Sequence, residues 1–268
     1  IAVRNNKGAF IILNGNQAAS LLIYYLLTRW SEKKKLTGNE FIVKTIVTTE
    51  LLASIARHYR VACYDVLTGF KYIADVIRQF EGKKTFIGGG EESYGYLAGD
   101  FVRDKDAVIS CALIAETAAW AKNQGKSMFE LLLEIYKGYG FYKEKLISLE
   151  RKGKSGLEEI QQMMKNFRTN PPAIINNSKV SEVIDYLDDA SIRKVNERNK
   201  GIKMPKSDVL QFITADGSKI SVRPSGTEPK IKFYFGVKEN LAAISDYENI
   251  NKLLDSRIEN IIRDLKIQ

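Results

Sequence analysis

The pattern of apolar and polar residues differs between the first and second parts of this chain. In its first part, short apolar runs alternate with longer segments in which apolar residues recur at helical spacing. In segment 70–80, for example, Phe70, Ile73, Val76 and Ile77 fall on one helical face. The expected strands cover residues 8–17 (with a turn), 40–47, 61–66 and 84–90, and the expected helices cover 18–35, 48–59, 70–80, 106–124 and 126–140. This alternation predicts a mostly parallel sheet with helices on both faces.

From Phe141 onward, short strands are separated by turn residues. The expected strands cover residues 141–150, 179–188, 209–223 (two strands and a turn) and 231–237, and the expected helices cover 155–168 and 240–268. Strands with flanking helices are typical of an α+β domain. The predicted class is therefore α/β: a mostly parallel α/β/α sheet domain over residues 1–140, followed by a smaller α+β domain over 141–268. In the first domain, Thr48 or Thr49 is expected to cap the helix over 48–59.

Composition narrows the function classes. Hydrophobic residues make up 44% of the chain and charged residues 27%, which is typical of a globular protein and not of a disordered one. No apolar run reaches the roughly 18 residues of a membrane span, so we expect no membrane segment. Cys63 and Cys111 lack metal-ligand spacing and indicate a reducing, cytoplasmic location. The net charge of +9 fits nucleic acid, anionic membrane or small phosphorylated ligands, and does not choose among them.

Two loops follow expected strands of the first domain, at residues 67–71 and 88–108. Ligands of such sheets bind beyond the carboxyl ends of the strands. The longer loop begins with three glycines and carries Glu91, Glu92, Ser93, Asp100, Arg103, Asp104, Lys105 and Asp106. Carboxylates beside a hydroxyl suit a ligand with several neighbouring hydroxyl groups, such as a sugar. An equally good interpretation is a polar surface loop in which Asp104 or Asp106 caps the next helix.

The stretch RPSGTEPK, residues 223–230, has the chemistry of an anion site. Arg223 offers a forked, permanently charged donor, while Ser225 and Thr227 offer hydroxyl groups. Gly226 lets successive backbone N–H groups turn toward an anion. The two prolines, at 224 and 229, limit the freedom that the loop would lose on binding. A plain hairpin turn is the alternative interpretation.

The motifs GEESYGYLAGDFVRDKDAV and RPSGTEPKIKFYF resemble the sugar-recognition and phosphate-binding loops of the α-D-phosphohexomutase superfamily, which comprises phosphoglucomutases and phosphomannomutases. The segments LTGFK and GAFIILNGNQ also resemble parts of that family, so the similarity covers essentially the whole chain. The resemblance implies the third of four family domains over residues 1–140, which is α/β and carries the tail of the second domain at its start, followed by the fourth over 141–268, which is α+β.

Carried over onto this sequence, the resemblance implies substrate contacts at Gly69, Lys71, Glu91, Ser93 and Lys105, and contacts to the phosphate that is not transferred at Arg223, Ser225, Gly226, Thr227 and Lys232. Glu91 and Ser93 match the pair that bonds sugar hydroxyl groups in the family. Gly95 stands where another branch has a histidine, which argues against equal use of mannose phosphate.

The resemblance also implies parts that this sequence does not contain. Family members transfer phosphate through a phosphoserine in a T-A-S-H-N-P-like loop and hold Mg²⁺ with D-x-D-x-D-R. Neither motif occurs here, and the single histidine is His58. We therefore expect a C-terminal, substrate-holding piece of an intramolecular phosphotransferase, with no catalytic or metal-binding residue and no turnover of its own. The implied whole enzyme uses Mg²⁺, forms a hexose 1,6-bisphosphate, and takes hexose phosphates and its own N-terminal domains as partners.

Three alternatives stay open at the level of sequence. Within the superfamily, the whole enzyme could be a phosphopentomutase or a sugar-bisphosphate synthase. Outside it, a basic nucleic-acid-binding module would use the same net charge, but should interleave its cations with exposed aromatic residues on one face. Here the basic residues are scattered and form only one run, at 33–35, so we expect no nucleic-acid partner.

Overall fold

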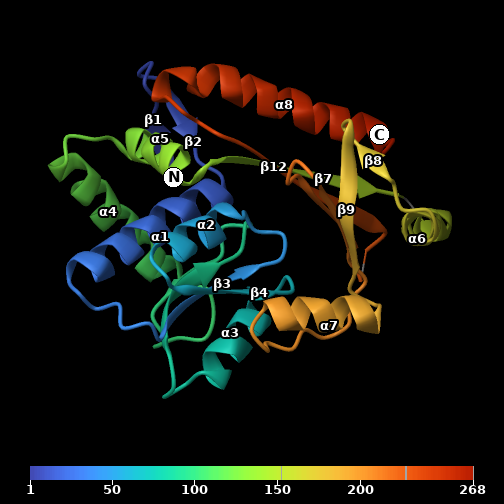
Figure 1. The fold of residues 1–268 in the computed structure, drawn as a ribbon, viewed down its shortest axis with the longest axis horizontal. Helices are drawn as coiled ribbons and strands as arrows, with labels where there is room; N and C mark the ends of the chain where they lie inside the picture. The colour runs from blue at the N-terminus through green and yellow to red at the C-terminus, as the bar shows by residue number, and fades with distance from the viewer. Residues whose placement is uncertain (152, 227, 268) are drawn as a thin grey trace. The chain divides into compact units, whose positions relative to one another are not determined.

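The computed structural model describes residues 1–151, 153–226 and 228–267 and contains two compact units (Figure 1). Unit 1 comprises Ile1–Phe141 and Asn240–Tyr247, and unit 2 comprises Tyr142–Glu239 and Glu248–Gln268. The domain limits 1–140 and 141–268 stay a prediction. The α/β class is confirmed: unit 1 contains the sheet with parallel strands, and unit 2 contains an antiparallel sheet.

The sheet of unit 1 has the strand order β4 (Ala62–Val66), β3 (Glu40–Thr45), β5 (Thr85–Gly90) and β6 (Tyr96–Ala98). Strand β3 is parallel to both of its neighbours, and β6 runs antiparallel to β5. All six residues of β3 are buried, as expected for a central strand covered on both faces.

Two details of the expected sheet were wrong. The strand expected within residues 8–17 does not join the parallel sheet: β2 (Phe10–Ile12) pairs only with β1 (Ala2–Arg4), in an antiparallel ribbon. The segment 88–108, expected to be a loop, contains β6. Periodicity could not show either difference, because strands of three residues are too short for a pattern.

The helices of unit 1 are α1 (Gly15–Glu32), α2 (Leu51–His58), α3 (Phe70–Gln79), α4 (Ala107–Asn123) and α5 (Met128–Tyr139), with a short 3₁₀ turn, η1 (Ile244–Asp246). The chain moves from β3 to β4, and then back past β3 to β5. Because such crossovers are right-handed, this reversal places α2 and α3 on opposite faces of the sheet (Figure 1). The reversal also makes the carboxyl ends of β3 and β5 a topological switch point, where ligands of open α/β sheets bind.

Of the two expected caps of α2, Thr49 does bond the start of the helix, although the N-cap position itself is Glu50. The residue that precedes the helix is Glu50, whose side chain makes no capping hydrogen bond. Thr49 Oγ1 accepts a hydrogen bond from the Leu51 N–H at 3.2 Å, and Thr48 Oγ1 lies 2.8 Å from Thr45 Oγ1. The Thr48 hydroxyl thus faces the end of β3 instead of the helix.

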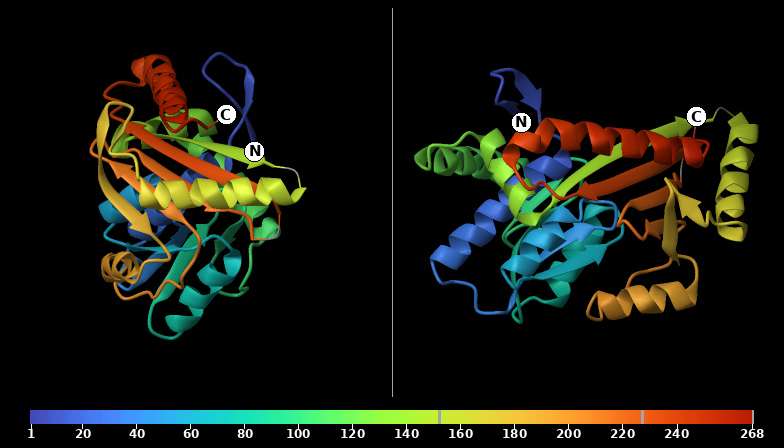
Figure 2. Two further views of the ribbon diagram at one scale, coloured as in Figure 1. Left: turned by 90° about the vertical axis from the view of Figure 1, so that its right-hand side faces the viewer. Right: turned by 45° about the horizontal axis from the view of Figure 1, so that its top comes forward.

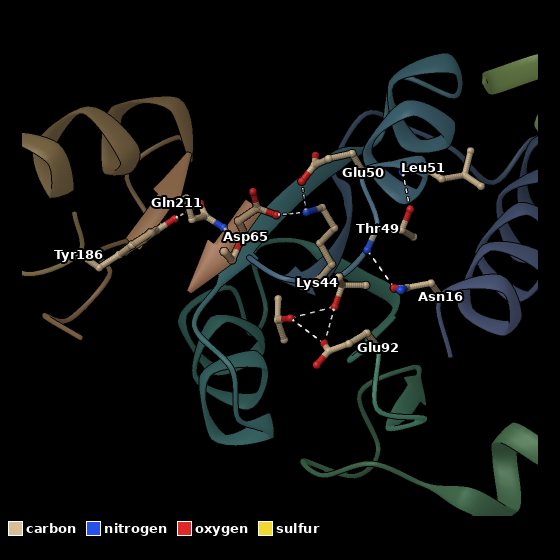
Figure 3. Close-up of polar contacts among 12 residues, drawn as sticks. Asn16, Lys44, Thr49, Glu50, Leu51, Asp65, Glu92, Tyr186 and Gln211 are labelled. Atoms are coloured by element: carbon tan, nitrogen blue, oxygen red, sulfur yellow. Dashed lines mark hydrogen bonds and ion pairs between the residues drawn. The ribbon is translucent and has the colours of Figure 1, made fainter. Parts of the chain in front are cut away.

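A buried lysine joins three elements of unit 1 (Figure 3). Lys44 on β3 is fully buried, with Nζ 2.8 Å from Asp65 Oδ1 on β4 and 2.9 Å from Glu50 Oε1 at the start of α2. Burial lowers the pKa of Lys44, but the two carboxylates raise it by more, so the net pKa is raised. The ammonium group therefore stays charged, and its two ion pairs hold the three elements together.

Unit 2 is built on a sheet with the order β7 (Phe141–Glu150), β12 (Lys230–Glu239), β11 (Lys219–Pro224), β10 (Leu210–Thr214), β9 (Ser178–Asp185) and β8 (Ile174–Ile175). Its helices are α6 (Gly153–Thr169), α7 (Asp189–Arg198) and α8 (Tyr247–Asp264). The hairpin expected within 209–223 is present as β10 and β11, and helix α7 was not expected.

Helix α8 runs along strands β7 and β12 (Figure 2). Lys143 Nζ on β7 donates to Asn251 Oδ1 at 2.7 Å, and Arg257 Nη1 donates to the Lys238 carbonyl oxygen of β12 at 2.8 Å. None of the helices within the described ranges is both long and apolar enough to cross a membrane.

The aromatic core of unit 1 leads to a prediction about stability. Phe41 is 1% exposed, and its ring contacts those of Tyr64, Phe80 and Phe86. Phe41→Ala should lower the free energy of unfolding by about 3–5 kcal/mol, because it removes a buried ring and leaves a cavity. Urea denaturation measures the change. Phe10→Ala is the matched control: Phe10 also lies on a strand of unit 1 but is 68% exposed, so a comparable loss there would contradict the assignment of the core.

Candidate functional site

Two loops that follow different strands are joined at the carboxyl edge of the unit 1 sheet. The backbone N–H of Gly69, after β4, donates a hydrogen bond to Glu91 Oε1, after β5, at 2.7 Å. Gly69 has a φ of +119°, a conformation that residues with side chains rarely adopt. The bond orients the Glu91 carboxylate and leaves its second oxygen for another partner.

Lys105 lies close to the same carboxylate. A Cβ atom placed on Gly95 would be 3.3 Å from Lys105 Cδ and 3.4 Å from Glu91 Oε2. The Lys105 ammonium group lies 5.6 Å from the centre of the Phe70 ring and 3.1 Å from Asp104 Oδ1. The structure therefore brings together Gly69, Glu91 and Lys105, and any side chain at position 95 would crowd the last two.

Two more of the predicted contacts lie on the surface of unit 1. Lys71, in the first turn of α3, is exposed, and its Nζ lies 4.9 Å from the centre of the Tyr72 ring. Ser93 is exposed as well, followed by Tyr94, which has a φ of +69°. A positive φ is uncommon for a tyrosine, and such strained positions are enriched at functional sites.

A second carboxylate of this loop, that of Glu92, is partly buried and faces the end of β3 (Figure 3). Glu92 Oε2 accepts hydrogen bonds from Thr45 Oγ1 and Thr48 Oγ1, both at 3.2 Å. Burial is the main cause that raises the pKa of Glu92, and the neighbouring charge of Glu91 adds to it, although hydrogen bonds from the threonines and from its own amide act in the opposite direction. Sequence reasoning placed Glu92 in the loop without a role, because the loop carries no signal that two threonines 44 and 47 residues earlier lie below it.

The capping interpretation of the loop also holds in part. Asp106 is the N-cap of α4, and its Oδ1 accepts hydrogen bonds from the Val108 and Ile109 N–H groups at 2.9 and 3.1 Å. Asp104 does not cap the helix; its Oδ1 accepts from the Lys105 N–H at 2.7 Å. One end of the loop therefore anchors a helix, while the other carries Glu91 and Ser93.

The predicted phosphate contacts all lie in unit 2. Arg223 on β11 and Lys232 on β12 are directly opposite one another in the antiparallel ladder, so their side chains emerge on the same face. Two like charges in this position repel each other and destabilise the strand pair. An anion between them would turn that repulsion into attraction, which is what a phosphate site requires.

The loop between these strands is held at both ends. The Ser225 N–H donates to the Lys230 carbonyl oxygen at 2.7 Å, and Ser225 Oγ accepts from the Glu228 N–H at 3.2 Å. Lys230 Nζ lies 2.8 Å from Glu150 Oε1 of β7, so this lysine ties the loop to the neighbouring strand. Gly226 has open space around it and a φ outside the left-handed region, so it leaves room for a ligand without being needed for the turn. Thr227 lies outside the described residues.

The residues present do not fit the Mg²⁺ that the resemblance implies. Within the described part of the chain, no three His, Cys, Asp or Glu side chains are grouped so that they could hold a metal ion.

Two models of one protein family match most of this chain. Residues 14–139 match the family model described as phosphoglucomutase/phosphomannomutase, alpha/beta/alpha domain III, and residues 175–250 match the model of the C-terminal domain of the same family. The chain belongs to the phosphoglucomutase/phosphomannomutase family. It carries domains III and IV of that family, as the resemblance implied.

Curated relatives and solved structures give the extent of the similarity. The chain is 36% identical over 258 residues to a phosphoglucomutase of Staphylococcus aureus strain MRSA252, and 39% identical over 238 residues to that of strain MSSA476. These matches cover 96% and 89% of this chain, but only 45% and 42% of the relatives. The chain thus spans less than half the length of the curated relatives it matches.

Two crystal structures show the same fold. The phosphoglucomutase pp63/parafusin from Paramecium, in its open form, gives a TM-score of 0.58 at 17% identity, over 96% of this chain and 43% of that one. A phosphoglucomutase/phosphomannomutase family protein from Burkholderia thailandensis gives 0.55 at 15% identity, over 96% of this chain and 44% of that one.

The partly buried Glu92 leads to a prediction about pH. Because its pKa is raised in the folded state, the stability that it contributes is fully present below the unfolded pKa of about 4.5 and is lost as the pH rises through the folded pKa. Glu92→Gln removes this loss, so the variant should gain stability relative to the native chain as the pH rises above about 4.5, by less than about 1.4 kcal/mol per pH unit.

Urea denaturation across this pH range provides the measurement. Glu130→Gln is a control of opposite sign, because hydrogen bonds from Ser127 lower the pKa of Glu130. The stability due to Glu130 is lost as the pH falls, so that variant should lose stability relative to the native chain as the pH rises. A stability difference for Glu92→Gln that does not change with pH would contradict the assignment.

The facing side chains of Arg223 and Lys232 lead to a prediction about how phosphate changes the stability of the chain. Inorganic phosphate should raise the Tm of this chain, by the equivalent of about 1.4 kcal/mol at ten times the Kd. Arg223→Ala should abolish most of that rise. Lys219→Ala is the matched control, since Lys219 lies on the same strand but opposite Gly236. Equal losses in both variants would show that only the overall charge matters.

Proposed function

We propose that this chain is the substrate-holding part of a phosphotransferase that interconverts hexose 1-phosphate and hexose 6-phosphate through a hexose 1,6-bisphosphate. Membership of the family and 36–39% identity to phosphoglucomutases support the reaction class. Hexose phosphates are the proposed ligands, and the remaining domains of a longer polypeptide are the proposed partners, because the relatives are more than twice as long as the matched region.

The observation that carries the proposal is the hydrogen bond between the Gly69 N–H and Glu91 Oε1. It joins two loops, each of which the family resemblance assigns to the substrate, and it does so at the switch point of the sheet. In the proposed complex, Glu91 and Ser93 bond neighbouring hydroxyl groups of the sugar. Lys105 and Lys71 supply positive charge on the same side.

A separate proposed binding site, in unit 2, is the loop between β11 and β12. Arg223 and Lys232 supply the charge for the phosphate that is not transferred, while Ser225, Gly226 and Thr227 supply hydroxyl and backbone donors. A firm hold on a group that does not react is useful, because binding energy far from the reacting atoms can be used to position the substrate. In phosphoryl transfer, positioning and charge neutralisation make up most of the catalysis.

The chemistry of transfer is assigned to a phosphoserine and an Mg²⁺ site that this sequence does not supply. Purified alone, the chain should therefore not convert glucose 1-phosphate to glucose 6-phosphate. A coupled assay with glucose-6-phosphate dehydrogenase measures this, with an intact phosphoglucomutase as the positive control. Turnover that persists through repeated purification would overturn this part of the proposal.

The isolated chain should still bind hexose phosphates. Variants in the two loops should then show what each loop contributes to the affinity. Arg223→Ala should weaken glucose 1-phosphate and glucose 6-phosphate by similar factors, of about tenfold or more, because a charge-assisted contact of about 1.5–3 kcal/mol is lost. Ser93→Ala should weaken the binding of both sugar phosphates by a smaller factor than Arg223→Ala does. It should leave the binding of inorganic phosphate unchanged. Isothermal titration calorimetry measures each Kd.

The same titration distinguishes the related functions. Tighter binding of ribose 1-phosphate than of glucose 1-phosphate would favour a phosphopentomutase. Tight binding of nucleic acid without binding of any sugar phosphate would reject the proposed function. We also propose a cytoplasmic location, which is supported by Cys63 and Cys111, since neither forms a disulfide within the described residues.

A further inference from the structure

The side chain of Glu92 points away from the surface on which its neighbours Glu91 and Ser93 lie. Its carboxyl oxygen Oε2 enters a socket formed by Thr45, the last residue of β3, and Thr48, in the turn that follows. Both threonines are fully buried. The turn is fixed in its own right, because the Thr49 N–H donates to Asn16 Oδ1 of α1 at 3.0 Å (Figure 3). The socket therefore belongs to a rigid part of unit 1.

The three oxygens of the socket lie within hydrogen-bond distance of one another. The Glu92–Thr45 and Glu92–Thr48 distances are 3.2 Å, and the Thr45–Thr48 distance is 2.8 Å. Each hydroxyl group has one proton to donate, so an ionised Glu92 leaves two protons for three contacts. A neutral acid supplies the third proton, and a glutamine can supply two from its amide nitrogen. Glutamine should therefore replace glutamate in the socket.

The backbone of Glu92 is confined as well. A Cβ atom placed on Gly15, in the first turn of α1, would lie 1.9 Å from the Glu92 carbonyl oxygen and 3.0 Å from the Tyr94 nitrogen. No side chain fits there unless the loop moves. The loop is thus held from below by the socket and from the side by the close approach of α1.

We propose that Glu92 is a positioning residue, whose side chain anchors the loop to the end of β3 so that Glu91 reaches the Gly69 N–H and Ser93 reaches the sugar. The role of the loop toward the sugar rests on the proposed function, whereas the anchor itself does not. Glu92 touches no reacting atom in this proposal. It acts through the two residues that flank it.

Hydrogen exchange of the Gly69 amide tests the anchor without any ligand, because that amide is bonded to the Glu91 side chain. In the 268-residue chain, Glu92→Ala should lower the protection of the Gly69 amide by about tenfold or more, while amides of β3 change only with global stability. Glu92→Gln should keep the native protection. Glu32→Gln, at an exposed glutamate of α1 in the same unit that pairs with Arg29 of its own helix, is the matched control. Unchanged protection in Glu92→Ala would overturn the proposal, as would a loss in Glu92→Gln equal to that in Glu92→Ala.

A second variant acts from the side of the backbone and leaves Glu92 intact. Gly15→Ala should displace the loop and lower the protection of the Gly69 amide. Gly138→Ala is its matched control: Gly138 also lies in a helix of unit 1, but has no atom within 4 Å of the added methyl group. If Gly15→Ala leaves the Gly69 amide as protected as Gly138→Ala does, the loop is not held in this way and the proposal is wrong.

Titration of the same variants with glucose 6-phosphate separates this proposal from the proposed function. Glu92→Ala should weaken binding by about the same factor by which it lowers the protection of the Gly69 amide, and Glu92→Gln should restore binding. If the exchange results are as expected but the native chain binds no hexose phosphate, the anchor stands and the proposed function fails. If hexose phosphate binds equally well to Glu92→Ala and to the native chain, the positioning role fails.

Discussion

The close approach of backbone segments around β5 is the constraint on which the rest of unit 1 depends. A Cβ atom on Gly89 would lie 2.1 Å from the Val43 carbonyl oxygen, and one on Gly90 would lie 2.3 Å from the Gly95 carbonyl oxygen. Side chains at these positions would push β5 away from β3 on one side and from the returning chain on the other. Because the glycines allow this packing, the residues that follow them emerge directly above the carboxyl ends of both parallel strands.

Charge is used in opposite ways in the two units. In unit 1, Lys44 is buried between two carboxylates, so its charge is neutralised inside the protein and contributes to the structure. In unit 2, Arg223 and Lys232 stand directly opposite each other, and their like charges repel. The first arrangement makes a scaffold, and the second makes a binding surface. An excess of positive charge in the composition could not distinguish the two.

The proposed sugar site has an inner and an outer layer, and both come from the same short loop. Glu91 and Ser93 form the outer layer, while Glu92 between them is directed into the protein. Alternating residues can serve these different purposes because the chain makes a tight turn here, with Tyr94 at a positive φ. A loop held from beneath loses little freedom when a ligand binds, which favours affinity.

Residue patterns alone predicted most of the secondary structure and the family of this protein. Apolar spacing located most strands and helices, because buried faces repeat every 2.0 or 3.6 residues. The motifs around Glu91 and Arg223 carried the family resemblance, since their glycines, prolines and charged groups stand at specific positions. Patterns failed where elements were too short or too polar: β6, the pairing of β1 with β2, and helix α7. The contacts beneath the site could not be predicted from the sequence either. Hydrogen bonds such as Glu92–Thr45 join residues that are far apart in sequence, and glutamate and threonine recur throughout the chain. Local spacing depends on geometry along the chain, whereas such contacts exist only once the strands have been ordered and the backbone segments packed.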